Sequence, residues 1–201
     1  MDIDDLQIDR RKKRRRRRLQ IAIVYIAMAI GLAWFFESQA TTTIIFVRHA
    51  EKEISNYDDP ELTAEGKMRV FELTRQLKDA DVVAGIDAIY STPFKRNIQT
   101  AEPLANALGL NINIYEKNKY EDVLDEILDR FKGKIILVVG HSDTLPRLMA
   151  ELGASKKVPN IADNEYDNIY IVSIPWFGKT KTIRLRYGRP YDPDEMTRAV
   201  K

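Results

Sequence analysis

Residues 19–36 form the longest apolar stretch of the chain, and Gln20 is the only strongly polar residue within it. At about 1.5 Å of rise per residue, a helix over this stretch would be roughly 27 Å long, close to the ~30 Å hydrocarbon core of a membrane. A helix in a soluble core would carry a polar stripe at helical spacing, and this stretch carries none. The pattern therefore predicts a single N-terminal transmembrane helix, closed by the interfacial aromatic residues Trp34, Phe35 and Phe36.

The pattern changes after residue 40, where short β-branched runs alternate with amphipathic segments. The β-branched runs predict strands at residues 43–47, 88–90, 112–115, 135–139, 169–174 and 183–186. The amphipathic segments predict helices at residues 64–78, 93–108, 122–131 and 144–152. Thr63 is the expected N-cap of the first helix, and Thr92 and Pro93 are the expected N-cap and first residue of the second. The glycines expected to end the last three helices are Gly109, Gly133 and Gly153.

Near-continuous apolar strands such as residues 135–139 are typical of a parallel sheet with both faces covered by helices. The predicted fold class is therefore α/β, a three-layer sandwich with a mostly parallel central sheet. We expect this domain over residues 37–190 and a polar tail over residues 191–201, with the chain loosening from Gly188 onward.

The composition describes one domain of ordinary size with a real core. The chain has 201 residues, of which 44% are hydrophobic and 31% charged, and this excludes wholesale disorder and fibrous repeats. It has no cysteine and two histidines. That excludes disulfides, thiolate zinc sites and cysteine nucleophiles, and it argues against a histidine-rich metal site. We expect no metal and no cofactor.

Positive charge is concentrated at the N-terminus. Residues 10–18 are all basic and hold nine of the 32 Lys and Arg, so the rest of the chain is mildly acidic and suggests no nucleic acid partner. Such a run before a span is expected to stay cytoplasmic, which predicts residues 1–18 inside and the folded domain outside, in a bacterial envelope. Lipid headgroup binding is compatible with this role. Ser38, Gln39 and Ala40 resemble a cleavage site, so the alternative is secretion after cleavage near Ala40.

Three motifs each follow a predicted strand. They begin at Arg48, Ser91 and Gly140, and they read Arg-His-Ala-Glu, Ser-Thr-Pro-Phe-Lys-Arg and Gly-His-Ser. Ligands of open α/β sheets bind outside the carboxyl ends of the strands. If these strands are parallel neighbours, the side chains that meet there are Arg48, His49, Arg96 and His141. The helix expected to begin at Thr92 would add its free amides to the same place.

Two arginines and two histidines beside free amides suit a phosphate dianion. Arginine offers a rigid fork for phosphate oxygens, and a neutral imidazole can attack phosphorus. Transfer would then pass through a phosphohistidine, with the other cationic groups stabilising charge as the phosphoryl group moves. Because two guanidinium groups can do what Mg²⁺ does elsewhere, this chemistry requires no metal.

These motifs resemble those of the histidine phosphatase superfamily, which includes the cofactor-dependent phosphoglycerate mutases. The resemblance spans about residues 43–153 and uses four ordered motifs, at residues 46–52, 62–66, 90–101 and 139–142. It implies that His49 is the nucleophile and Arg48 its phosphate-binding neighbour. It also implies that Arg96 is the second phosphate arginine and His141 the late histidine beside the transferred group.

The chain departs from larger members of that superfamily in two ways. Only 44 residues separate Arg96 from His141, so the chain resembles the compact branch, which includes phosphohistidine phosphatases acting on proteins. The general acid found in the insertion of larger members has no matching motif here. The candidates left open are Glu116, Glu121, Asp122 and Asp143, and for Asp143 an N-cap role is favoured.

Other polar and aromatic residues have simpler interpretations. Glu51 and Lys52 are expected to be a solvated loop pair. The acidic loop at residues 164–168 is either a turn or part of the pocket rim. The aromatic residues expected to serve packing rather than substrate stacking are Tyr115, Tyr120 and Trp176.

The sequence thus predicts a metal-independent hydrolase of the histidine acid phosphatase type, acting through a phosphohistidine on His49. Its substrate would be a phosphorylated small molecule or a phosphoprotein, as a phosphomonoester or phosphoramidate. One alternative enzyme is a phosphohistidine phosphatase acting on a signalling protein. A phosphoglycerate mutase is disfavoured by the short insertion and the predicted topology. The non-enzymatic alternatives are a membrane-tethered phosphate-binding module and an electrostatic membrane adaptor acting through residues 10–18.

Overall fold

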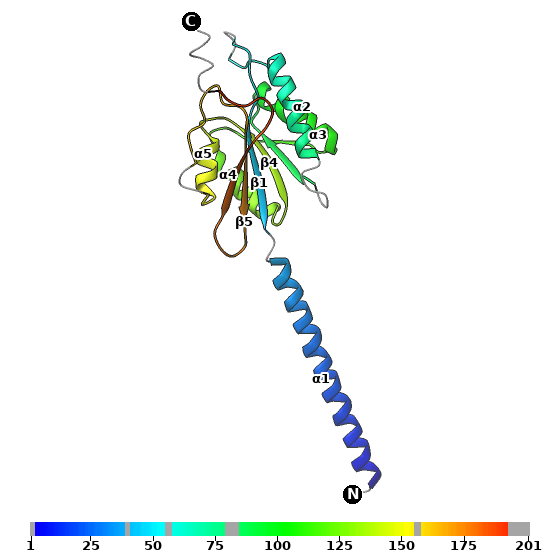
Figure 1. The fold of residues 1–201 in the computed structure, drawn as a ribbon. Coiled ribbons are helices and arrows are strands. Elements are labelled where there is room, and N and C mark those ends of the chain that lie inside the picture. Colours follow the sequence, from blue (N-terminus) through cyan, green and yellow to red (C-terminus); the bar gives the residue numbers. More distant parts are fainter. Residues whose placement is uncertain (1–2, 39–40, 55–57, 79–84, 155–157, 193–201) are drawn as a thin grey trace. The chain divides into compact units, whose positions relative to one another are not determined.

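The computed structural model describes residues 3–38, 41–54, 58–78, 85–154 and 158–192 (Figure 1). The chain divides into two compact units, Met1–Ala40 and Thr41–Lys201. The first unit is one long helix, α1 (Ile3–Ser38), so the helix predicted over residues 19–36 is present and extends well toward the N-terminus. Lysine and arginine are good helix formers, which explains why the basic run continues the helix. The segment Lys12–Phe35, with a mean hydropathy of 1.7 in its most apolar window, is long and apolar enough to cross a membrane.

The second unit is built on one six-stranded sheet, and each predicted strand is present with ends shifted by at most two residues. The spatial order is β3-β2-β4-β1-β5-β6. The pairings β3–β2, β2–β4 and β4–β1 are parallel, while β1–β5 and β5–β6 are antiparallel. The sheet is therefore mixed, with β5 running against the other five strands. The bounds are β1 (Thr42–Arg48), β2 (Ala88–Ser91), β3 (Ile112–Ile114), β4 (Ile135–Gly140), β5 (Asn168–Ile174) and β6 (Lys181–Arg186).

Helices cover both faces of this sheet, as predicted. One apolar cluster joins α2 (Ala64–Lys78) and α3 (Lys95–Leu108) to one face. A second cluster joins α4 (Tyr120–Arg130) and α5 (Leu145–Glu151) to the opposite face. The central strands β1 and β4 are almost entirely buried, which explains their near-continuous apolar sequence.

The helix starts differ from two predictions. α2 begins as expected, because the Thr63 hydroxyl accepts a hydrogen bond from the Gly66 amide at 3.0 Å. α3 begins only at Lys95, and Thr92 does not cap it. α5 takes Thr144 rather than Asp143 at its N-cap position. The two predicted caps that are not used, Thr92 and Asp143, follow the carboxyl ends of strands, and their side chains make contacts in the candidate site.

Candidate active site

The parallel pairing of β1, β4 and β2 brings the three motifs to one edge of the sheet. Arg48 at the end of β1 lies opposite Gly140 at the end of β4, and Ser91 of β2 lies opposite Val139. The His49 amide donates to the Gly140 carbonyl at 3.0 Å. Because the carboxyl ends lie side by side, residues separated by more than 90 positions in sequence meet here, as the sequence predicted.

The two histidines of the chain form a buried pair. Their ring centroids are 5.4 Å apart, and the ring planes are inclined at 67°. Nδ1 of His49 lies 2.8 Å from the carbonyl oxygen of Ala50. Since a carbonyl only accepts hydrogen bonds, the proton of a neutral His49 ring lies on Nδ1, and Nε2 keeps its lone pair. Nε2 of His141 lies 3.0 Å from the hydroxyl oxygen of Thr92.

Both imidazoles are neutral at physiological pH. Burial lowers the pKa of His49 to about 3, and the positive charge of Arg48 adds to this effect, against the opposing hydrogen bond to Ala50. Burial likewise lowers the pKa of His141 to about 4, with the nearby charge of Lys117 acting in the same direction. A neutral ring with a free Nε2 is the form of histidine that can act as a nucleophile.

Only part of the Arg48 guanidinium is hydrogen-bonded by neighbouring protein groups. Its Nη1 donates to the carbonyl oxygens of Ala162 at 2.7 Å and Glu165 at 3.1 Å, and its Cζ lies 4.2 Å from the centre of the Tyr166 ring. Its Nε is buried and has no hydrogen-bond partner among the described residues. The guanidinium is therefore oriented by protein groups and retains donor capacity for an anion.

Arg96 lies in the first turn of α3 and has a similar environment. Its Nη1 is 3.5 Å from a carboxylate oxygen of Asp59, and its Cζ lies 4.5 Å from the centre of the Phe94 ring. Its Nε is likewise buried without a partner in the described part of the chain. Phe94 also lies edge-on to His141, with ring centroids 5.3 Å apart. Phe94 therefore packs against both the second arginine and the second histidine.

Two of the four acid candidates form ion pairs with lysine side chains. Glu116 is exposed and pairs with Lys119 at 3.4 Å. Asp143 pairs with Lys117 at 2.7 Å. Partial burial acts to raise the pKa of Asp143, but the Lys117 ammonium outweighs it and holds that pKa below its ordinary value. Asp143 is thus an ionised carboxylate near His141. The remaining candidates lie exposed in the first turn of α4: Glu121 and Asp122.

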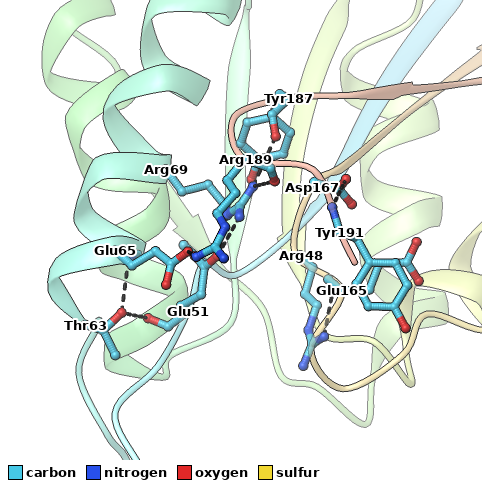
Figure 2. A network of polar contacts seen from close by, with 12 residues as sticks. Arg48, Glu51, Thr63, Glu65, Arg69, Glu165, Asp167, Tyr187, Arg189 and Tyr191 are labelled. Carbon is cyan, nitrogen blue, oxygen red and sulfur yellow. Dashed lines mark hydrogen bonds and ion pairs between the residues drawn. The ribbon is translucent and has the colours of Figure 1, made fainter. Parts of the chain in front are cut away.

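Glu51 is not the solvated residue that was expected. It forms an ion pair with Arg69 at 2.6 Å, and both side chains are largely buried. Arg69 also donates to the carbonyl oxygens of Tyr187 and Arg189, as Figure 2 shows. The pair therefore connects the segment after β1 with α2 and with the chain after β6. Lys52 is exposed, in agreement with its prediction.

The same network corrects the expectation that the chain loosens from Gly188. Arg189 pairs with Glu65 at 3.1 Å, and the Tyr191 amide donates to Asp167 at 2.9 Å (Figure 2). The segment just after β6 is thus attached to α2 and to the loop before β5. Residues 193–201 of the predicted tail lie outside the described residues.

The acidic loop does border the site, through Tyr166. The Tyr166 ring lies 6.0 Å from the His49 ring and also lines a cavity of about 270 Å³. Other residues of that cavity wall include Glu51, Arg69, Asp167, Arg189 and Tyr191.

The predictions about aromatic packing are partly confirmed. Tyr115 is buried, and Tyr120 packs against the same cluster. Trp176, however, is 53% exposed, which overturns its assignment to packing.

Sequence reasoning missed several residues around the histidine pair. Thr92 and Phe94 lie inside a motif that it had singled out, so their presence near the site was foreseeable. Asp59 and Lys117 come from loops without any motif, and only the fold brings them to Arg96 and Asp143.

Comparisons with known proteins agree with this geometry. The family model for the histidine phosphatase superfamily (branch 1) matches residues 44–119. No curated protein matches the sequence.

Solved structures share the fold at low identity. The protein histidine phosphatase SixA in complex with tungstate is 19% identical, with a TM-score of 0.58 over 72% of this chain and 96% of its own. A mycobacterial glucosyl-3-phosphoglycerate phosphatase is 12% identical, with a TM-score of 0.56 over 73% of this chain and 98% of its own. A phosphoglycerate mutase from Plasmodium falciparum is 16% identical, with a TM-score of 0.54 over 76% and 96%. The family model over residues 44–119 and the fold shared with these structures agree with the resemblance of the four ordered motifs to the histidine phosphatase superfamily, branch 1.

Proposed function

We propose that the protein is a metal-independent phosphatase that works through a phosphohistidine on His49. The observation that carries this proposal is the hydrogen bond from Nδ1 of His49 to the Ala50 carbonyl, which leaves Nε2 as the nucleophilic nitrogen. A buried neutral imidazole beside two oriented guanidinium groups is poorly suited to a purely structural role. It is well suited to receive a phosphoryl group.

In the first step, Nε2 of His49 attacks phosphorus, a P–N bond forms, and the bond from phosphorus to the leaving group breaks with its electron pair going to that group. Arg48 and Arg96 stabilise the charge on the equatorial oxygens with their unpartnered donors. His141, hydrogen-bonded to Thr92, adds a polar contact at the transferred group. In the second step water attacks phosphorus, the P–N bond breaks with its electron pair returning to Nε2 of His49, and phosphate leaves carrying the protons of water.

A phosphohistidine phosphatase acting on a signalling protein is the second candidate. It is favoured by Asp143, which pairs with Lys117 and has a lowered pKa, so this carboxylate is not a proton donor for a leaving oxygen. A phosphoimidazole whose second ring nitrogen is protonated leaves as neutral imidazole, so its P–N bond can break without an acid at the leaving atom. The fold that the chain shares with the protein histidine phosphatase SixA supports the same candidate. A soluble phosphomonoester would need a good leaving group to be cleaved without such an acid.

We further propose that residues 19–36 are an uncleaved anchor, with residues 1–18 in the cytoplasm and the catalytic domain outside. The nine basic residues before the apolar stretch support this orientation. The mass of the mature protein tests it, because cleavage near Ala40 would remove the first 40 residues. A domain facing the cytoplasm would favour the signalling-protein substrate.

The first experiment measures phosphate release from p-nitrophenyl phosphate by the full chain in detergent with EDTA, for the wild type and His49→Ala. We expect turnover that is lost in the variant, together with an acid-labile, alkali-stable phosphoryl label on the wild type alone. Turnover that persists in His49→Ala contradicts the proposal. If neither p-nitrophenyl phosphate nor a phosphohistidine peptide is hydrolysed but phosphate still binds, the chain is a phosphate-binding module.

A further inference from the structure

Two large aromatic side chains stand exposed in the loop between β5 and β6, residues 175–180. Trp176 is 53% exposed and Phe177 is 82% exposed. Exposed tryptophan beside exposed phenylalanine is uncommon on a surface that meets only water, and adjacent exposed aromatics mark interaction surfaces. Neither residue contributes to the two apolar clusters that hold the sheet and its helices together.

The loop lies at the end of the sheet opposite to the histidine pair. Thr42, the first residue of β1, pairs with Ile174, the last residue of β5, so the loop follows directly beside the start of β1 (Figure 1). His49 follows the other end of β1. At about 3.3 Å per residue, the length of β1 separates the two ends by roughly 20 Å.

Exposed lysines lie at the same end of the sheet as the two aromatic residues. Lys179 and Lys181 flank the loop and are exposed, and the described salt bridges involve neither of them. The turn before β4 lies at the same end, because the Gly133 amide donates to the Thr42 hydroxyl at 3.0 Å. Lys132 in that turn is exposed as well. An aromatic pair at the same end as exposed lysines suits the interface of an anionic bilayer.

Acidic side chains also lie at this end, among them Asp87 and the exposed Asp129 in the last turn of α4. Lys134 pairs with Asp87 at 3.1 Å and is largely neutralised. The Thr180 hydroxyl donates to the Leu152 carbonyl at 2.9 Å, which brings the loop beside the last turn of α5 and its exposed Glu151. This hydrogen bond also attaches the end of the loop to the domain.

Chain connectivity keeps this end of the domain near any membrane that α1 crosses. Three residues separate Ser38, where α1 ends, from Thr42, where β1 begins. A fully extended chain spans at most about 3.6 Å per residue, so a linker of this length can span at most roughly 14 Å. The loop beside Thr42 is therefore within reach of the bilayer surface.

We infer that residues 175–180 form a membrane-contact loop that places Trp176 and Phe177 in the interfacial region of the bilayer. The inference rests on the proposed transmembrane anchor. With the anchor as the first contact and this loop as the second, the domain would be held in one orientation at the membrane. The carboxyl ends of β1, β2 and β4 would then face away from the membrane, and the site would take its substrate from the aqueous phase.

The chain contains two tryptophans, Trp34 in the apolar stretch and Trp176 in the loop, so each can be observed alone. The full chain carrying Trp34→Phe is reconstituted in vesicles of phosphatidylcholine and phosphatidylglycerol, with and without lipids brominated along the acyl chains. We expect blue-shifted emission from Trp176 and its loss in the brominated vesicles. Both leaflets carry the quencher, so the result does not depend on the direction of insertion.

The converse variant, Trp176→Phe, reports on the anchor by itself. Quenching of Trp34 without quenching of Trp176 overturns the membrane-contact loop and leaves the anchor intact. If Trp34 escapes the brominated lipids, the anchor fails and the loop proposal falls with it. If Trp176 is protected from aqueous acrylamide but not reached by brominated lipid, the loop contacts protein instead, which also overturns the inference.

A matched pair of substitutions tests the aromatic contact in the Trp34→Phe background. Phe177→Ser is expected to reduce the blue shift of Trp176 and its quenching. Phe71→Ser removes a phenylalanine of similar exposure, 66%, from α2 and is expected to change neither. Equal effects of the two substitutions contradict a specific role for the loop.

Discussion

The two ends of the sheet show opposite exceptions to the usual rule that polar side chains are exposed and aromatic side chains are buried. At the carboxyl end of the parallel strands, ionisable and polar side chains are buried, among them Arg48, His49 and His141. At the other end, Trp176 and Phe177 are exposed. Buried charge and exposed aromatic surface both cost stability, and functional sites are where such departures persist. The two proposals above account for this difference: phosphate chemistry at one end and an apolar contact at the other.

The largest effect is expected from removing the proposed nucleophile, His49, at the polar end. His49→Ala should reduce kcat by about 10³-fold or more, because no other group of the site can form the phosphoenzyme. His49→Gln, which keeps the size of the side chain, should lose activity to the same extent. Steady-state phosphate release measures both, with thermal unfolding to verify the fold. A loss in His49→Ala that His49→Gln restores would assign His49 a structural role.

Replacing the first arginine should have the next largest effect. Arg48→Lys keeps one positive charge but removes the guanidinium fork and its stacking on Tyr166, so we expect kcat/KM to fall by about 10²-fold. The control is Arg75→Lys, at an exposed arginine of α2 that pairs only with Glu72 among the described residues. An equal response of the two variants would remove Arg48 from the phosphate site.

The buried ion pair beside the site should contribute to folding stability. Glu51→Ala leaves the buried Arg69 guanidinium without its carboxylate, and such a change typically costs about 3 kcal/mol of unfolding free energy. Glu72→Ala breaks the exposed pair with Arg75 and should cost less than about 0.5 kcal/mol. Urea unfolding of both variants measures the difference. Similar values would show that the Glu51–Arg69 pair is screened by solvent.

The histidine pair should make stability depend on pH. The folded-state pKa values, about 3 for His49 and about 4 for His141, lie below the ordinary value of 6.5. Between those values the unfolded chain binds more protons than the folded one, so unfolding free energy falls as pH decreases from about 6.5 toward 4. His49→Gln should flatten this slope relative to wild type in urea unfolding at several pH values. An unchanged slope would mean that His49 titrates normally in the fold.

The smallest effect is expected at the opposite end. Phe177→Ser should change unfolding free energy by less than about 0.5 kcal/mol and leave phosphate release unchanged in detergent, because Phe177 is mostly exposed and far from the histidines. Val172→Ser in the adjacent strand, where the side chain is fully buried, provides the contrast and should be strongly destabilising. A large loss in Phe177→Ser would show that the loop packs against the domain.

Local patterns in the sequence were enough to predict the helices and strands. Apolar runs of four to seven residues marked β1, β4 and β5, since both faces of those strands are covered. The start of α3 was placed too early because Thr-Pro is a frequent helix start, and here the Thr92 hydroxyl lies against His141 instead. The tertiary contact prevailed over the local preference.

The same division holds for the site. The sequence alone determined which residue types follow the strands, including Arg48, His49 and His141, because strand ends and glycines are local features. The pairing of Lys117 with Asp143 and the exposure of Trp176 could be seen only in the folded structure. These outcomes depend on distances between segments remote in sequence and on how completely each side chain is covered. Neither quantity is set until the sheet order and the packing of the helices are established.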